Sequence, residues 1–135
     1  MSKYYKVVKL FDDKLTSINS ITIITYTVGQ VTHPLPNTGG VFVFKKLEDA
    51  KKFYYSNCGY NIKLRIYECK VTNPRELKVR ADIDAYSMCE FWLEYFKCRK
   101  NHRSVNKMEK SYTWAAPSGT YLASSVTLIK EYTND

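Results

Sequence analysis

The chain has 135 residues, enough for one domain of ordinary size that buries roughly two thirds of the surface its unfolded chain would expose. Hydrophobic residues make up 44% of it and charged residues 25%, a composition that excludes an intrinsically disordered protein. The formal net charge of +8 favours polyanions, phosphorylated small molecules or acidic protein surfaces as partners, although a solvated basic surface accounts for it equally well.

The first expected elements are two strands. Tyr4–Phe11 predicts a strand in which Tyr5, Val7 or Val8 and Leu10 compete for the inward face. Ile21–Gly29 is so rich in β-branched residues that it predicts the clearest strand of the chain. The face of this second strand that we expect to turn inward consists of Thr22, Ile24, Tyr26 and Val28.

A loop and a strand–helix unit follow. Two prolines and two glycines lie within residues 32–40 and predict a rigid loop. Val41–Phe44 then predicts a short buried strand. From Leu47 the apolar residues recur with the period of a helix, which Asn57 or Gly59 can end.

The second half begins with residues 61–71, whose alternation predicts a strand with one solvent-facing side. Leu77–Arg80 can add a short edge strand. A second helix is expected over Asp82–Lys100, with Asp82 as its cap and an apolar face made of Ala85, Met88, Cys89, Trp92 and Phe96, widened by Phe91 and Tyr95. Residues 111–132 predict one or two strands around a turn at Pro117–Thr120.

These elements predict a single α+β domain over residues 1–135. We expect an antiparallel or mixed sheet of five to seven strands, packed on one face by the two helices. No segment repeats, and no domain boundary is evident. The pattern leaves the strand order open.

The cysteines and the N-terminus indicate a reducing, cytoplasmic setting. The chain has four cysteines, at Cys58, Cys69, Cys89 and Cys98. Their spacing is not that of a zinc site, and neither His33 nor His102 stands at a finger-like distance, so we expect buried free thiols and no metal. We expect no secretion signal, and no apolar run of the sequence is long enough to span a bilayer.

Few residues indicate catalysis. Gly39 and Gly40 lack the context of a phosphate-binding loop, which favours a turn, and His33 has no partner in sequence that would make it a base. Glu68 and Glu90 lie on otherwise apolar elements, where a carboxylate could serve as a general acid or base. A solvent-facing position is the competing explanation for both.

A basic cluster is the strongest local signal. Within fourteen residues it contains Lys97, Arg99, Lys100, His102, Arg103, Lys107 and Lys110, interrupted in charge only by Glu109. Tyr112 and Trp114 follow, and flat rings beside cations can stack on a base whose phosphates the cations hold. The alternative is a helix end followed by a solvated loop.

A smaller cluster lies at the first helix, with Lys45, Lys46, Lys51 and Lys52. Ser118, Gly119 and Thr120 supply hydroxyl and backbone donors that could bind an anion, or form an ordinary turn. We predict the ligand-binding residues to be Lys45, Lys46, Arg99, Lys100, Arg103, Lys107, Tyr112, Trp114, Ser118 and Thr120. No catalytic residue, metal ligand or cofactor is predicted.

Several segments together resemble a known type of domain. They are "YYKVVK", "YTVGQVTHP", "GGVFVFKKLEDAKKF", "RIYECKV" and "PSGTYLASSVTLIK", with an isolated tryptophan before the last. They resemble a small domain found in proteins of bacteriophages and large DNA viruses, over nearly the whole chain. The resemblance implies a viral or phage origin and an intracellular role during infection, and it supplies no catalytic residue.

Three hypotheses about function follow. The first is a non-enzymatic, homo-oligomeric counter-defence protein that sequesters a phosphorylated small molecule such as a nucleotide signal. The second is an inhibitor that binds nucleic acid or an acidic host protein, in which case binding should weaken steeply with salt. The third is an ADP-ribosyltransferase-like or nucleotide-hydrolysing enzyme, which would need Glu68 or Glu90 in position.

Overall fold

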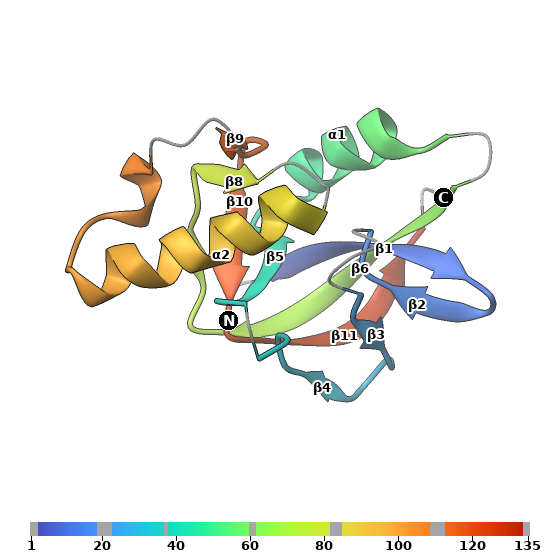
Figure 1. The fold of residues 1–135 in the computed structure, drawn as a ribbon. Helices are drawn as coiled ribbons and strands as arrows, with labels where there is room; N and C mark the ends of the chain where they lie inside the picture. Colours follow the sequence, from blue (N-terminus) through green and yellow to red (C-terminus); the bar gives the residue numbers. More distant parts are fainter. Residues whose placement is uncertain are drawn as a thin grey trace.

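The computed structural model describes residues 3–18, 23–36, 38–59, 62–81, 85–108 and 113–133. A large antiparallel sheet and two helices dominate the fold (Figure 1). The strands of this sheet are β1 (Tyr4–Phe11), β2 (Lys14–Thr16), β3 (Thr25–Tyr26), β4 (Val31–Thr32), β5 (Val41–Phe44), β6 (Lys63–Thr72), β7 (Arg75–Glu76), β10 (Thr120–Ala123) and β11 (Ser125–Tyr132). A separate ribbon pairs β8 (Val79–Ala81) with β9 (Thr113–Ala115), and the helices are α1 (Leu47–Asn57), α2 (Ala85–Lys100) and the short 3₁₀ helix η1 (Val105–Lys107).

The strand order of the large sheet is β4-β11-β6-β1-β5-β10-β7, and β2 joins β1 to β3. The predicted α+β class is confirmed, but within the described residues the sheet has nine strands instead of five to seven. The surplus consists of strands of two or three residues, such as β4 and β7, which are too short to produce an alternating pattern in the sequence.

Both helices cover the same face of the sheet. Phe42 and Phe44 are alternate residues of β5 and therefore point to one side. Phe42 packs in the apolar cluster of α2, and Phe44 packs in that of α1. Neither helix of the described chain is long and apolar enough to cross a membrane.

Helix α1 begins and ends where the sequence predicts. Glu48 and Asp49 lie in its first turn, where the helix dipole favours negative charge. Cys58 closes the other end by donating its backbone N–H to the carbonyl of Tyr54. Ala50 is buried against the sheet, as the predicted apolar stripe requires.

Helix α2 is confirmed over Ala85–Lys100, and the predicted cap Asp82 lies outside the described residues. Its predicted buried face is partly wrong, because Cys89 is exposed and Phe96 is 43% exposed. The residues that it buries are Met88, Phe91, Trp92, Tyr95 and Cys98. Apolar residues surround most of this helix, so the sequence allows two neighbouring faces, and packing against Leu122 of β10 selects one of them.

The strand predicted over Ile21–Gly29 is mostly wrong. Residues 21 and 22 lie outside the described part, and only Thr25–Tyr26 forms a strand. Its partner β2 is only three residues long, and the chain then turns at Gly29, whose backbone φ of +86° a side chain rarely adopts. Tyr26 does point inward as predicted, whereas Val28 is exposed.

Strand β6 is buried on both sides, although a single solvent-facing side is predicted. Leu64 and Ile66 face α1, while Cys69 on the opposite side packs with Val8 and Leu128 in a second core. Tyr26 of β3 also packs in this second core. The C-terminal region likewise forms three strands, β9 to β11, where one or two are predicted.

Candidate functional site

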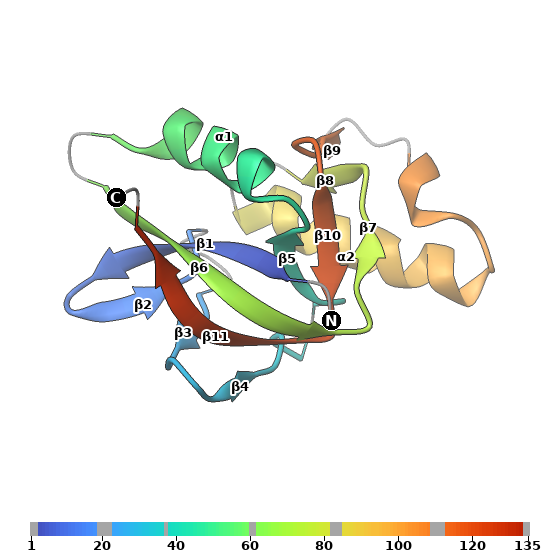
Figure 2. The ribbon, with the colours of Figure 1, turned by 180° about the vertical axis from the view of Figure 1, so that it is seen from behind.

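The large sheet is split between its central strands β1 and β5. Strand β1 pairs with β6 over seven residue pairs, but it pairs with β5 only where Tyr5 meets Phe44. Figure 2 shows the cause, since β5, β10 and β7 turn away from β1, β6 and β11. The backbone groups of β5 that point toward β1 beyond this pair, near Phe42, must therefore find other hydrogen-bond partners.

Lys6 supplies one of these partners. Its Nζ donates a hydrogen bond of 2.7 Å to the backbone carbonyl of Phe42, across the gap between β1 and β5. Lys6 lies on the same face of β1 as Tyr4 and Val8, and it is only 8% exposed. The split in the sheet thus places a basic side chain inside the protein.

A cavity of about 80 Å³ lies at the split, and we call it the Lys6 cavity. Strands β1, β3, β5, β8 and β10 contribute to its wall, together with both helices. Its aromatic lining consists of Tyr26, Phe42, Phe44, Phe53 and Trp92. The cavity is therefore largely apolar, with a basic group in its wall.

Burial changes the acid–base behaviour of this basic group. Desolvation lowers the pKa of Lys6 from 10.5 to about 8, because a charged amine loses its hydration inside the protein. The ring of Tyr26 lies 5.8 Å from Nζ and gives a weak cation–π contact. No acidic side chain lines the cavity among the described residues. Within this part of the chain, the Lys6 cation has no carboxylate partner.

Two residues of the cavity lining also carry buried hydrogen-bond donors. Within the described structure, the hydroxyl of Tyr26 and the indole N–H of Trp92 have no hydrogen-bond partner, and these side chains are only 3% and 4% exposed. Burial also raises the pKa of Tyr26, so its hydroxyl keeps its proton. Native proteins rarely leave such groups without a hydrogen-bond partner. A polar ligand is therefore one possible partner for these two donors.

Arg80 adds a second positive charge to the lining. It comes from β8, and its guanidinium carbon lies 5.5 Å from the ring centre of Phe53. Thr38 and Thr120 also line the cavity, but their hydroxyls already donate to the carbonyls of Leu35 and Pro117. The chemistry of the described lining is therefore rich in donors and positive charge.

The structure brings only some of the predicted ligand-binding residues together. The backbone N–H of Lys45 donates a 3.3 Å hydrogen bond to the carbonyl of Gly119, which lies between Ser118 and Thr120. Arg99, Lys100, Arg103 and Lys107 are exposed at the end of α2 and in the segment after it, which projects away from the start of α1 in Figures 1 and 2. The other members are Lys45, Lys46 and Ser118, which are exposed, Trp114, which is 60% exposed, and Tyr112, which lies outside the described residues. Of the described members, Thr120 alone lines the Lys6 cavity.

Sequence reasoning missed Lys6, Arg80 and Trp92 as site residues. The sequence did contain a signal for Lys6. Residues 4, 6 and 8 of a strand lie on the same face, so Lys6 shares its face with the apolar side chains of Tyr4 and Val8. Nothing in the sequence indicates that Trp92 and Arg80 meet it, because the split in the sheet brings them together.

A second hollow lies on the surface between α1 and the ends of β6 and β11. It has a volume of about 330 Å³, and we call it the tyrosine groove after Tyr54, Tyr55 and Tyr132 in its lining. Lys51 reaches over the groove, with its Nζ 5.0 Å from the ring centre of Tyr132. Rings and a cation thus occur together on this surface, although not at the predicted basic cluster.

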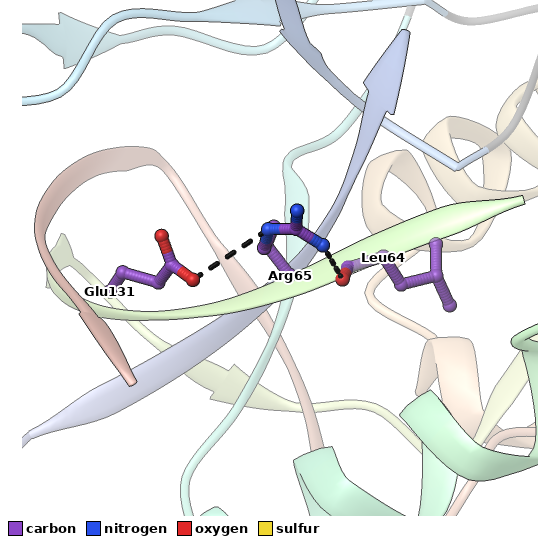
Figure 3. Close-up of polar contacts among 3 residues, drawn as sticks. All are labelled: Leu64, Arg65 and Glu131. Atoms are coloured by element: carbon purple, nitrogen blue, oxygen red, sulfur yellow. Dashed lines mark hydrogen bonds and ion pairs between the residues drawn. The ribbon is translucent and has the colours of Figure 1, made fainter. Parts of the chain in front are cut away.

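Arg65 also lines the tyrosine groove, and two contacts hold its guanidinium in place. Its Nε lies 3.6 Å from a carboxylate oxygen of Glu131, and its Nη1 donates a 3.0 Å hydrogen bond to the backbone carbonyl of Leu64 (Figure 3). Both partners come from the ends of neighbouring strands. The guanidinium is therefore oriented, and its charge is partly offset by Glu131.

The predicted acid or base residues lie elsewhere. Glu68 forms an ion pair of 2.9 Å with Lys3, and neither Glu68 nor Glu90 lines the Lys6 cavity. The four cysteines are free thiols, of which Cys69 and Cys98 are buried and Cys58 and Cys89 exposed. No group of His, Cys, Asp and Glu in the described ranges could hold a metal ion.

Comparisons with known proteins give no match. No family model matches the chain, and neither the curated proteins nor the solved structures contain a significant match. The resemblance to a domain of phages and large DNA viruses therefore stays a prediction, and the candidate site is defined by its geometry alone.

Proposed function

We propose that the protein is a binding protein that captures a small anionic molecule in the Lys6 cavity. The observation that carries the proposal is the buried Lys6 amine, which faces a cavity with no acidic side chain in its described lining. A buried charge without a partner costs several kcal/mol, and a bound anion would remove that cost. In a phage- or virus-infected cell, as the resemblance implies, such capture would withhold the anion from host proteins.

The size of the cavity limits the ligand. The cavity measures only about 80 Å³, so its ligand must be small. Pockets for larger ligands usually measure about 300 Å³ or more. We therefore propose a small carboxylate or inorganic phosphate for this cavity, in place of the nucleotide expected from the sequence.

The donors of the lining set the expected affinities. A hydrogen bond to a charged group contributes about 1.5–3 kcal/mol, so loss of the Lys6 amine should weaken anion binding about 10- to 100-fold. The neutral Tyr26 hydroxyl should contribute less. Because only the protonated amine attracts an anion strongly, binding should also weaken as the pH rises past the pKa of Lys6, which is about 8.

Thermal shift and calorimetry with acetate, inorganic phosphate and pyruvate test this proposal. We expect at least one of these anions to stabilise the wild-type protein. Lys6→Met should weaken binding about 10- to 100-fold, and Tyr26→Phe should weaken it less. Lys70→Met should leave it unchanged, since Lys70 is exposed on β6. Absence of binding by all three anions, or equal binding by Lys6→Met, would contradict the proposal.

A second candidate is binding of single-stranded nucleic acid at the tyrosine groove. The exposed ring of Tyr55 beside Lys51 is the observation that favours it, because bases stack on such rings while cations hold the backbone. A short oligonucleotide in the same panel separates the two candidates. Binding that falls steeply with salt, is lost in Tyr55→Ala and persists in Lys6→Met would support this candidate.

A further inference from the structure

Lys6 has the environment of a reactive amine. Its Nζ lies in the wall of the Lys6 cavity and is held by its hydrogen bond to the Phe42 carbonyl. Amines attack carbonyl carbons only when neutral, and desolvation in an apolar pocket is a recognised way to make a lysine nucleophilic. With a pKa of about 8, roughly a tenth of the amine is neutral at pH 7, against less than about a thousandth at 10.5.

The groups that face Lys6 do not remove this reactivity. Cys69 on β6 keeps its proton, because burial raises the pKa of its thiol to about 12. Tyr26 on β3 likewise stays neutral, and Arg80 on β8 adds positive charge to the lining. Among the described residues at the cavity, none supplies a negative charge that would hold the proton on Lys6 at neutral pH.

The remaining lining selects the kind of carbonyl compound. The hydroxyl of Tyr26 and the indole N–H of Trp92 belong to residues of this lining, and hydrogen-bond donors suit a carboxylate. The volume of about 80 Å³ restricts the ligand to a small molecule. A small α-oxo acid combines the carboxylate with a carbonyl carbon within this size, whereas acetate and phosphate have no carbon that an amine attacks.

We propose that Lys6 forms an imine with the carbonyl carbon of a small α-oxo acid, such as pyruvate or glyoxylate, bound in the Lys6 cavity. The lone pair of the neutral amine attacks the carbonyl carbon and forms a C–N bond. The C–O bond breaks, and the oxygen leaves as water with the two protons that the nitrogen carried. No oxidant or reductant is needed. This inference rests on the proposed function, because the carboxylate is the captured anion.

Reductive trapping tests the imine. The full-length protein is incubated with pyruvate and cyanoborohydride, which reduces an imine to a stable secondary amine, and intact mass and peptide mapping locate the product. We expect one carboxyethyl group, on Lys6, at a pyruvate concentration that leaves the exposed Lys70 unmodified. The initial rate of trapping should rise about 50-fold between pH 6 and pH 8, as the neutral fraction of the amine does, and acetate should compete. Lys6→Met should give no adduct at that concentration.

The outcomes separate this inference from the proposed function. Calorimetric binding of pyruvate without any adduct on Lys6 would overturn the imine and leave anion capture standing. Equal modification of Lys6 and exposed lysines would also overturn it, because no site would then be selective. If none of the anions binds at all, the proposed function fails together with the imine.

Discussion

Replacement of Lys6 by methionine is expected to raise the free energy of unfolding of the ligand-free protein by about 2 kcal/mol at pH 7. The lowering of the pKa of Lys6 from 10.5 to about 8 means that folding disfavours its charged form by about 3 kcal/mol. Methionine has a similar length and removes this cost. It also removes the hydrogen bond to the Phe42 carbonyl, a loss of about 1 kcal/mol.

The pH dependence of this effect has a definite sign. Below pH 8 Lys6 is charged in both states, and the full cost of burial is present. Between about 8 and 10.5 the unfolded chain holds a proton that the folded protein has released, so Lys6 makes wild-type stability rise with pH. Cys69 acts the other way above pH 9, because its folded pKa is raised to about 12, but it does so in wild type and variant alike.

Urea unfolding at pH 7, 8, 9 and 10 measures the difference between the two proteins. The advantage of Lys6→Met should shrink as the pH rises and disappear near pH 10. Lys70→Met, on an exposed part of β6, should stay within about 0.5 kcal/mol of wild type throughout. A variant that is less stable than wild type at pH 7 would show that the buried amine carries no net cost.

Gly40→Ala is expected to lower the free energy of unfolding by about 3 kcal/mol. Gly40 precedes β5 and lines the Lys6 cavity. An added Cβ would lie 2.7 Å from the backbone oxygen of Ala123 and 2.7 Å from Cγ of Leu122. Both neighbours belong to β10, which pairs with β5, so the clash cannot be relieved without separating the two strands. The same change should therefore also weaken anion binding.

Gly29→Ala is the matched control for this substitution. Gly29 also has a positive φ, but a Cβ there would have no atom within 4 Å, so only the backbone strain of about 1 kcal/mol is expected. Thermal and urea unfolding of both variants measure the difference. Equal losses of stability in the two variants would mean that the close approach of β5 and β10 does not require glycine at position 40.

The sequence predicts those segments of the fold whose residue pattern is compatible with only one type of secondary structure. Strand β1, strand β5 and helix α1 lie within their predicted bounds, because alternation or helical spacing there is reinforced by a clear end signal. Ile21–Gly29 has equally strong β propensity but forms only Thr25–Tyr26, because a strand also needs a neighbour to pair with. The sequence also left the buried side of α2 ambiguous, because contacts with β10 determine which of its apolar residues are buried.

The candidate site depends on tertiary structure even more strongly. The predicted cations of residues 97–110 stand close together in sequence, which is typical of a solvated surface, and those that the structure describes are exposed. The Lys6 cavity instead joins residues from β1, β3, β8 and α2, which meet because β1 and β5 separate after a single residue pair. No spacing in the sequence encodes that separation. A lysine on an inward strand face was the one available clue.

The most direct test of anion capture is an NMR titration of Lys6 itself, through its ¹³Cε and ¹⁵Nζ signals assigned by comparison with Lys6→Met. In the free protein we predict a pKa of about 8, and saturating acetate or phosphate should raise it, because the anion stabilises the charged amine. A pKa near 10.5 that neither anion changes would contradict the account, since Lys6 would then be an ordinary solvated lysine.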